Sequence, residues 1–370
     1  MPDPAADRAT PAATEPAVPP PDDLAPPLTP DALEERLSRP TSGVLGVLER
    51  VPGDVVVLGA GGKMGPSLAR MARRALDALG GAHAGRRVTA VSRYEGPEGA
   101  ARRAQLAAWG VETASADLLD RRAVAALPAA PLVVYMAGLK FGTAAAPARM
   151  WATNTVAPAL VAERYAGARV VAFSTGNVYP PSAAPGRGLA EDAALTPVGE
   201  YANACVARER VLEWACDRHG SPLALVRLSY AVDLRYGVLV DVAERVRRGE
   251  PVDVRTGWVN VVWQGDANAQ ALQCFARAGD PAFAVNVTGP EPVAVAEVAR
   301  RFGAVFRKVP ALVGRTLPDA LLSDTGLAQR LFGPPAVPTA RLIEWVGEWL
   351  RAGNATLGRP TKFEVRDGRY

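Results

Sequence analysis

The sequence predicts an α/β protein built on a doubly wound parallel sheet, followed by a smaller C-terminal α+β region. Short apolar runs alternate with segments of helical periodicity between residues 54 and 228, which is typical of parallel strands joined by helical crossovers. The run at residues 55–58 continues through a glycine-rich turn into a segment with apolar residues at helical spacing. Past residue 228 the alternation loosens, and the second region is expected there.

The composition is that of a globular protein with a large core. The chain has 370 residues, 49% of them hydrophobic, and a mean hydropathy of +0.03, which allows one large or two moderate domains. Its longest apolar runs are shorter than a membrane span, and its start lacks the basic and apolar segments of a signal peptide. We therefore expect a cytoplasmic protein with no membrane partner.

The charge balance and the few cysteines and histidines exclude further classes of partner and site. The 42 Lys and Arg residues against 38 Asp and Glu give a formal charge of +4, and no basic run is interleaved with aromatic residues, so no nucleic-acid partner is expected. The cysteines Cys205, Cys216 and Cys274 are too scattered for a disulfide framework. His83 and His219 lack metal-ligand spacing, so no metal site is expected. A small-molecule substrate is the expected partner.

The first 52 residues precede the sheet. Residues 1–28 are rich in Pro and Ala and are expected to be a disordered tail, because they contain too few large apolar side chains to offset the entropy of ordering. Residues 29–52 are expected to form two short helices. The first is capped by Thr29 with Pro30 at its first position, and the second follows Thr41.

Residues 53–235 are expected to carry the parallel sheet, and residues 236–352 the smaller region. Residues 353–370 are expected to form an extended tail. After residues 55–58, the expected strands are residues 87–92, 111–114, 132–136 and 169–173. The expected helices are residues 97–109, 150–165, 200–219, 236–249, 265–278, 297–302 and 339–350.

The glycine-rich turn is the strongest functional signal. Without side chains at its glycines, the backbone turns sharply, a pyrophosphate approaches main-chain N–H groups, and the next helix packs closely on the strand. The positive end of that helix then faces the anion. The turn therefore predicts a dinucleotide-binding Rossmann-type domain, held by Gly59, Gly61, Gly62, Lys63, Met64 and Gly65.

Besides a dinucleotide-binding turn, the sequence of this turn has three other interpretations. A P-loop requires glycine at Val57 and Ser or Thr at Met64, so that interpretation fails. Residues 65–69 resemble a nucleophile elbow, but they lack its final glycine and lie inside the expected helix. An ordinary glycine-rich turn without a ligand stays open as the alternative.

Several further positions together resemble the extended short-chain dehydrogenase/reductases, also called the NAD-dependent epimerase/dehydratase family. The resemblance covers about residues 54–350. Its marks are the glycine spacing, residues 117–118, residues 136–138, Asn154, residues 173–179, Tyr201, Arg227 after the sixth strand, Asp266 and residues 285–289. In this family the ligand lies at the carboxyl ends of the strands, where Ser92, Asp117, Ala137 and Ser174 fall. The resemblance thus adds Asp117, Leu118, Ala137 and Gly138 to the expected cofactor site.

The resemblance also implies catalytic roles. Thr175 matches the residue whose hydroxyl holds the reacting oxygen, and Tyr201 matches the acid/base tyrosine, which also contacts the cofactor. Hydride leaves a carbinol carbon only if a base takes the hydroxyl proton, and a tyrosine needs a nearby cation to do so at neutral pH. The family pattern Tyr-x-x-x-Lys is broken here, because Cys205 stands at the lysine position.

Three explanations for the missing lysine stay open: another cation replaces it, the reaction differs, or the protein binds cofactor without turnover. Lys140, in the loop after the fourth strand, is the best candidate for a replacement at the catalytic and substrate site, the alternative being a solvated surface lysine. Cys205 is expected to be a small helix residue rather than a nucleophile.

A second departure concerns the kind of reaction. In the family's sugar-nucleotide dehydratases the two positions after the catalytic threonine are acidic, whereas this chain has Gly176 and Asn177. Oxidoreduction or epimerisation is therefore favoured over dehydration. Asn177 is expected either to hydrogen-bond a hydroxylated substrate or to shape the turn.

Cofactor choice follows from the end of the second strand. NAD-selective sites usually place an acid there, whereas this chain has Ser92 followed by Arg93, so NADP is favoured and NAD stays possible. Lys63 is expected to supply a second cation. Arg93 has an alternative explanation in the abundance of arginine, and Asp117 is expected either to face the adenine or to cap a short helix.

The resemblance thus implies an NAD(P)-dependent oxidoreductase or epimerase acting on a sugar, sugar acid or similar polyhydroxylated molecule. It also implies a homodimer formed through the helices at residues 150–165 and 200–219. The alternative is a dinucleotide-binding sensor or scaffold protein that has lost catalysis together with the lysine.

Overall fold

The structure is a computed structural model that describes residues 25–140 and 146–369. Its centre is a seven-stranded sheet in the order β12-β7-β5-β4-β1-β2-β3, and every neighbouring pair is parallel. The predicted α/β fold with a doubly wound parallel sheet is confirmed. The strands are β1 (Val55–Leu58), β2 (Val88–Ser92), β3 (Glu112–Ser115), β4 (Leu132–Tyr135), β5 (Arg169–Thr175), β7 (Leu223–Leu228) and β12 (Phe283–Val287).

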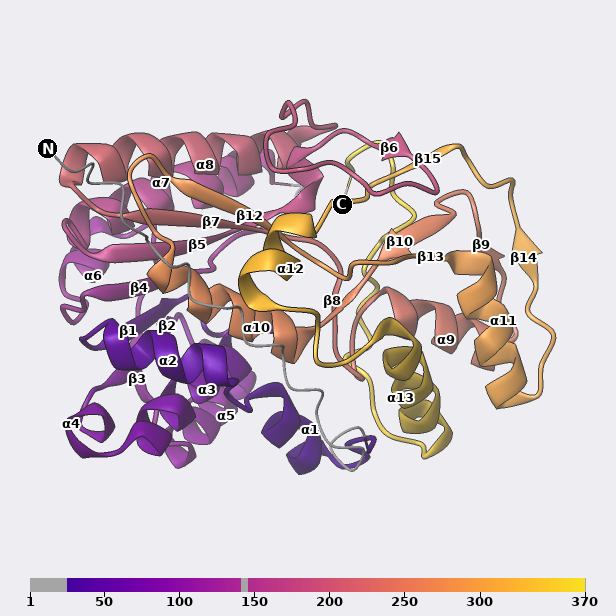
Figure 1. Ribbon diagram of the computed structural model, residues 1–370, viewed down its shortest axis with the longest axis horizontal. Helices are drawn as coiled ribbons and strands as arrows, with labels where there is room; N and C mark the ends of the chain where they lie inside the picture. The colour runs from indigo at the N-terminus through magenta and orange to yellow at the C-terminus, as the bar shows by residue number, and fades with distance from the viewer. Residues whose placement is uncertain (1–24, 141–145, 370) are drawn as a thin grey trace, which may run out of the picture.

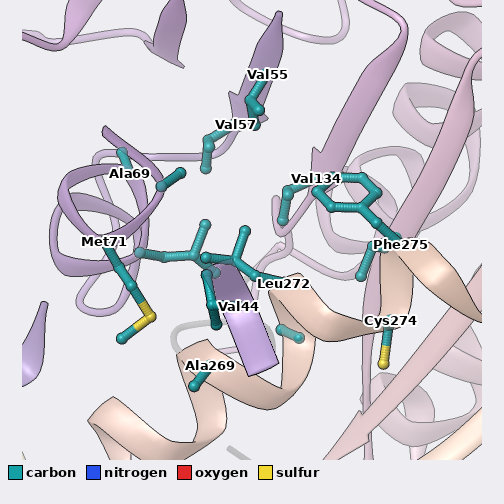
Figure 2. Packing of buried hydrophobic residues seen from close by; sticks show 14 of the residues in the cluster. Val44, Val55, Val57, Ala69, Met71, Val134, Ala269, Leu272, Cys274 and Phe275 are labelled. Atoms are coloured by element: carbon teal, nitrogen blue, oxygen red, sulfur yellow. The ribbon is translucent and has the colours of Figure 1, made fainter. Parts of the chain in front are cut away.

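Alternate residues of the central strands feed two different cores, because successive side chains of a strand point to opposite faces. Val55 and Val57 of β1 face the helices α2 (Ser42–Arg50), α3 (Gly65–Leu79) and α10 (Gln264–Gln273). Figure 2 shows Val55, Val57 and Val134 on this side, with Met71 and Leu272 of the covering helices. Val56 and Leu58 face the opposite layer, which includes α7 (Pro147–Arg164) and α8 (Glu200–His219). Burial on both faces explains why β1 is apolar throughout.

The N-terminal helices begin where the sequence places their caps. The side chain of Thr29 accepts a hydrogen bond from the N–H of Ala32 at the start of α1 (Pro30–Leu37), and Thr41 caps α2 in the same way. The remaining helices of this half are α4 (Gly81–Ala84), α5 (Gly96–Ala108) and α6 (Arg121–Ala125). Residues 1–24 of the expected disordered tail lie outside the described residues.

The smaller C-terminal region has a core of its own, on the right in Figure 1. It is formed mainly by α9 (Val238–Arg248), α11 (Val295–Phe306) and α13 (Thr339–Arg351), and Leu33 and Leu37 of α1 join it. Trp263 and Trp345 meet edge to face there, with ring centroids 5.5 Å apart. Short strands lie between its helices, namely β8 (Ala231–Val232), β9 (Val252–Asp253), β10 (Trp258–Asn260), β11 (Val262–Trp263), β13 (Pro292–Ala294), β14 (Leu312–Val313) and β15 (Asp319–Ala320). β15 pairs with β6 (Ser182–Ala183), which precedes α8, and α12 (Gly326–Phe332) packs with the core of the main sheet through Ala328.

Two further elements within residues 236–352, the expected smaller region, pack with the main sheet instead. β12 pairs with β7 at the edge of the main sheet, and α10 packs on that sheet, although both fall within residues 236–352. Residues 353–369 contain no helix or strand but pack against the smaller region, where Phe363 is buried and Thr361 donates two hydrogen bonds to Asp241. Within the described part of the chain, no helix combines the length and the apolar character needed to span a membrane.

Asp266 fastens α10 to the segment before α13. It is buried in the first turn of α10, and its Oδ2 accepts a hydrogen bond from the backbone N–H of Val337 at 3.1 Å. Burial raises the pKa of this carboxyl to about 7, although backbone N–H groups partly oppose the rise. Its charged form is therefore disfavoured in the folded protein.

This placement predicts a pH-dependent stability. Because the folded pKa lies above the ordinary value, the contribution of Asp266 is fully present below pH 4 and is lost as pH rises through 7, by roughly 1.4 kcal/mol per pKa unit. Asp266→Asn keeps a carbonyl acceptor for Val337 and does not titrate. Urea unfolding between pH 4 and 8 should show the native protein losing stability relative to Asp266→Asn. Asp253→Asn, which removes the partly buried carboxylate paired with the exposed Arg255, should show the same pH dependence as the native protein. Equal slopes for native protein and Asp266→Asn would contradict the prediction.

Candidate active site

A cavity of about 370 Å³ lies between the carboxyl ends of the strands and the smaller region. Among the described residues that line it, three are cationic and none is acidic. Parallel strands with crossovers place their ligand sites at this edge. The lining residues are Gly59, Gly62, Lys63, Met64, Gly65, Met136, Gly138, Lys140, Phe173, Ser174, Thr175, Asn177, Tyr201, Arg208, Leu228, Ser229, Tyr230, Ala231, Tyr236, Gly237, Val238, Leu321 and Thr361.

The glycine turn brings three backbone segments into close approach. Gly59 has a φ of +88°, and a Cβ at this position would lie 2.6 Å from the backbone nitrogen of Ala137, in the loop after β4. A Cβ at Gly65 would lie 2.5 Å from the carbonyl oxygen of Ala60. Side chains at these positions would push the backbone segments apart. The turn therefore packs closely, and it lines the cavity at the positive end of a 15-residue helix, where an anion is stabilised.

Lys63 extends from this turn toward the smaller region. Its ammonium donates a hydrogen bond to the carbonyl of Ala231 at 2.9 Å and lies 5.0 Å from the ring centroid of Tyr236. Burial lowers the pKa of Lys63 to about 8, with the nearby Asp233 partly opposing the change. The expected second cation therefore lies on the β7 side of the cavity, whereas Ser92 ends β2 on the other side of β1.

The other expected cofactor residues lie outside the lining of this cavity, in the glycine turn after β1 and at or after the ends of β2, β3 and β4. A Cβ at Gly61 would lie 2.4 Å from Oγ of Ser92, and Arg93 forms a long, exposed ion pair of 3.6 Å with Glu95. The carboxylate of Asp117 accepts a hydrogen bond from the N–H of Leu119 at 3.0 Å. The short helix α6 is instead capped by Asp120. The residues concerned are Gly61, Ser92, Arg93, Asp117, Leu118 and Ala137.

Thr175 and Asn177 form a local pair at the end of β5. The hydroxyl of Thr175 donates to Oδ1 of Asn177 at 3.1 Å and accepts from its backbone N–H at 3.2 Å. Both side chains line the cavity, so the arrangement shapes the turn and presents polar atoms to a ligand at the same time. Gly176 between them is packed against Ser229, where a Cβ would lie 1.9 Å from Oγ.

Tyr201 and Lys140 meet across the cavity. The ammonium of Lys140 lies 5.8 Å from the ring centroid of Tyr201, which is 8% exposed. Burial lowers the pKa of Lys140 to about 8, and Cys205 partly opposes the change. The sequence-predicted trio of Thr175, Tyr201 and Lys140 therefore shares one cavity. Residues 141–145, which continue this loop, lie outside the described residues.

Sequence reasoning missed two charged residues on α8, Arg208 and Glu209, both buried. Together with Tyr201 and Cys205 they occupy positions i, i+4, i+7 and i+8, which lie on one face of a helix. That spacing is a signal in the sequence that could have found them. Arg227, expected after the sixth strand, lies instead within the sixth strand of the sheet, β7.

Glu209 joins α8 to the sheet through a buried ion pair. Its carboxylate accepts from Arg227 at 2.8 Å, with the two side chains 0% and 6% exposed, and it also accepts from the hydroxyl of Ser174. Arg227 in turn donates to the hydroxyl of Tyr179 at 2.8 Å. The fold at the back of the cavity depends on this network.

Removing one charge of this pair should cost much more than removing an exposed one. Glu209→Gln leaves the Arg227 guanidinium buried without a counter-charge, which costs about 3–5 kcal/mol of unfolding free energy. Glu213→Gln is the matched control on the same helix, because its pair with Arg210 is largely exposed and contributes about 0–1 kcal/mol. Chemical denaturation of both variants measures the difference, and equal losses would contradict the importance of the buried pair.

Comparison with known proteins identifies one family that the chain matches. The sequence profile of the NAD dependent epimerase/dehydratase family matches residues 55–256. No curated protein matches the chain.

Within the described residues, no group of three or more His, Cys, Asp or Glu side chains is arranged to hold a metal ion.

Solved structures of low sequence identity share the fold. MoeE5 in complex with UDP-glucose and NAD is 23% identical, with a TM-score of 0.61 over 81% of this chain and 99% of that chain. The UDP-glucuronic acid 4-epimerase from Bacillus cereus in complex with NAD is 14% identical, with a TM-score of 0.64 over 80% and 98% of the two chains. The UDP-glucose 4-epimerase from Thermotoga maritima with UDP-glucose is 17% identical, with a TM-score of 0.63 over 81% and 99%.

Proposed function

Because this chain belongs to the NAD dependent epimerase/dehydratase family and is an enzyme of the extended short-chain dehydrogenase/reductase type, we propose that it oxidises or epimerises a polyhydroxylated sugar. The observation that carries the proposal is the meeting of Thr175, Tyr201 and Lys140 in one cavity with the glycine turn. The solved structures of similar fold hold UDP-sugars and NAD, which supports the same classes of ligand here.

The cavity fits a nicotinamide dinucleotide. Gly59 and Gly65 let the turn pack tightly against Ala137 and Ala60, whereas a Cβ at Gly62 would meet only the carbonyl oxygen of Gly59 at 3.5 Å, so the turn stays open there, before the N-terminus of α3. Met64 and Gly65 offer backbone N–H groups to a diphosphate. Gly61, Ser92 and Arg93 would hold the adenosine ribose, and Asp117, Leu118, Ala137 and Gly138 would border the adenine and the middle of the cofactor.

In the proposed reaction the chain's own residues handle the substrate oxygen and its proton. The bound nicotinamide supplies the chemistry of hydride acceptance and return. Thr175 donates a hydrogen bond to the reacting oxygen, and Tyr201, as phenolate, takes the hydroxyl proton while the carbon loses hydride. Tyr201 returns the proton when the carbonyl is reduced, and reduction on the opposite face gives the epimer. Gly176 and Asn177 offer no acid or base for dehydration.

The charge of the cavity favours an anionic substrate. Among the described residues that line it, Lys63, Lys140 and Arg208 are cationic and none is acidic. Diphosphate-linked sugars and sugar acids both bring the negative charge that such a site stabilises. Lys63, hydrogen-bonded to Ala231 next to the smaller region, is suited to the substrate anion, and Lys140 to the reacting end beside Tyr201.

Turnover tests this proposal with UDP-glucose, UDP-glucuronic acid and neutral glucose. The two anionic sugars should change the reduced-nicotinamide absorbance or exchange solvent hydrogen at a carbinol carbon. Tyr201→Phe and Lys140→Met should each lower kcat at least roughly 100-fold, because proton transfer and its supporting charge are lost. Dinucleotide affinity should change little, and Lys308→Met, an exposed lysine, is the control.

The pH dependence adds a second readout. Lys140 is charged only below its pKa of about 8, so native activity should fall as pH rises through that value, and Lys140→Arg should retain activity above it. A fully active Lys140→Met variant would show that catalysis does not depend on Lys140. Binding of dinucleotide with no turnover of any hydroxylated substrate would favour the sensor or scaffold alternative.

We also propose a preference for NADP over NAD. Ser92 brings no carboxylate to repel a 2′-phosphate, and the exposed Arg93, only loosely paired with Glu95, is available for it. Calorimetric titration should give at least roughly tenfold tighter binding of NADP, since a charge-assisted hydrogen bond contributes about 1.5–3 kcal/mol. Arg93→Ala should remove the preference, whereas Arg121→Ala, an exposed arginine paired with Glu163, should keep it. Tighter binding of NAD to the native protein would show the preference to be wrong.

A further inference from the structure

A buried guanidinium lies next to the position of the missing lysine. Cys205 follows Tyr201 by one helical turn, and Arg208 follows Cys205 by three residues on the same face of α8. Arg208 is 5% exposed and lines the same cavity as Tyr201. Its neighbourhood therefore contains a fixed positive charge although the family lysine is absent.

Two elements outside α8 hold this guanidinium in place, and a third leaves room for it. Nη2 donates to Oδ1 of Asn154 in α7 at 2.6 Å, and Nη1 donates to the carbonyl of Phe173 in β5 at 2.8 Å. Gly138, after β4, makes room for it, because a Cβ there would lie 3.1 Å from Nη2. A side chain fixed by hydrogen bonds to two elements keeps its charge at one point, which is what electrostatic stabilisation of a reacting group requires.

The thiol of Cys205 connects this charge to the tyrosine. Nη2 of Arg208 lies 3.2 Å from Sγ of Cys205, and Cys205 shares a side-chain hydrogen bond with Tyr201. Burial by itself lowers the pKa of Arg208, but the charges of Cys205, Tyr201 and Tyr135 raise it on balance. The guanidinium therefore stays protonated and interacts electrostatically with the phenol.

We propose that Arg208, acting across the Cys205 thiol, is the positioning residue whose fixed positive charge stabilises the Tyr201 phenolate in place of the family lysine. The inference rests on the acid/base role proposed above for Tyr201. It divides the role of the absent lysine between two residues, because Lys140 lies beside the Tyr201 ring while Arg208 acts through the thiol of Cys205.

The other charged and titratable groups around this site do not supply the same effect. Glu209 on α8 is neutralised by Arg227 of β7, and Tyr135 of β4 is a buried phenol whose pKa burial raises. Lys140 loses its charge near pH 8, because burial and, to a smaller extent, the nearby Lys362 of the C-terminal segment lower its pKa. Arg208 keeps its positive charge, and no carboxylate among the described residues pairs with it within an ion-pair distance.

A direct titration of Tyr201 tests the proposal without requiring turnover. The ultraviolet difference between the native protein and Tyr201→Phe during base titration isolates the ionisation of this one phenol. The same difference is measured in Arg208→Gln and Arg208→Lys backgrounds. Arg210→Gln, on the exposed side of α8, is the matched control. Repeating the series with Lys140→Met removes the contribution of the second cation.

The expected result is a rise of the Tyr201 midpoint by roughly one pH unit or more in Arg208→Gln and by less than about half a unit in Arg208→Lys. Cys205→Lys added to Arg208→Gln should bring the midpoint back toward the native value. A folded Arg208→Gln variant with the native midpoint would overturn the proposal. If circular dichroism shows Arg208→Gln to be unfolded, Arg208→Lys decides: it keeps the charge, so a rise of a full unit there overturns the proposal and a near-native midpoint supports it.

The Tyr201 titration tests the role of Arg208 independently of the turnover assay that tests the proposed function. A protein with no turnover on any sugar, in which Arg208→Gln still shifts the Tyr201 midpoint, would contradict the enzyme proposal alone. Native turnover with an unmoved midpoint would contradict the role of Arg208 alone.

Discussion

One face of α8 is the constraint on which the site depends. It buries a phenol, a thiol, a guanidinium and a carboxylate within nine residues, and each needs partners because an unpaired buried polar group or charge is destabilising. The Glu209–Arg227 pair ties the helix to β7, and the Arg208 hydrogen bonds tie it to α7 and β5. These bonds fix the rotation of α8 and thereby turn Tyr201 toward the cavity.

The cavity itself follows from the topology of the sheet. Parallel strands deliver their carboxyl ends to one edge, and the glycine turn lets the segment after β1 lie directly against the loop after β4. The smaller region then covers this edge. Its core includes α1 at the start of the chain, and the segment after α13 contributes Thr361 to the lining, so both ends of the described chain help to close the site.

The sequence predicted the parts of this arrangement that depend on local pattern. The bounds of β1, the caps at Thr29 and Thr41, and the alternation that builds the parallel sheet all follow from composition and spacing over a few residues. The family resemblance brought Thr175, Tyr201 and Lys140 to one place, and the structure puts all three on the wall of one cavity.

Features that depend on contacts between distant segments were missed. β12 returns to the main sheet only because β7 offers it an edge, and nothing within its own five residues indicates that pairing. The direction of the Lys63 side chain is set by a hydrogen bond to the carbonyl of Ala231, 168 residues away. The burial of Asp266 depends on the segment before α13, which hydrogen-bonds it. Arg208 looked like one of many arginines, because its partners lie on α7 and β5.

A crystal structure of the protein with an oxidised nicotinamide dinucleotide tests the central claim most directly. The account predicts the diphosphate within hydrogen-bonding distance of the N–H groups of Met64 and Gly65, with the nicotinamide end beside Tyr201, Lys140 and Arg208. A dinucleotide bound away from the glycine turn, or lying in the cavity with its adenine end against Tyr201, would contradict it.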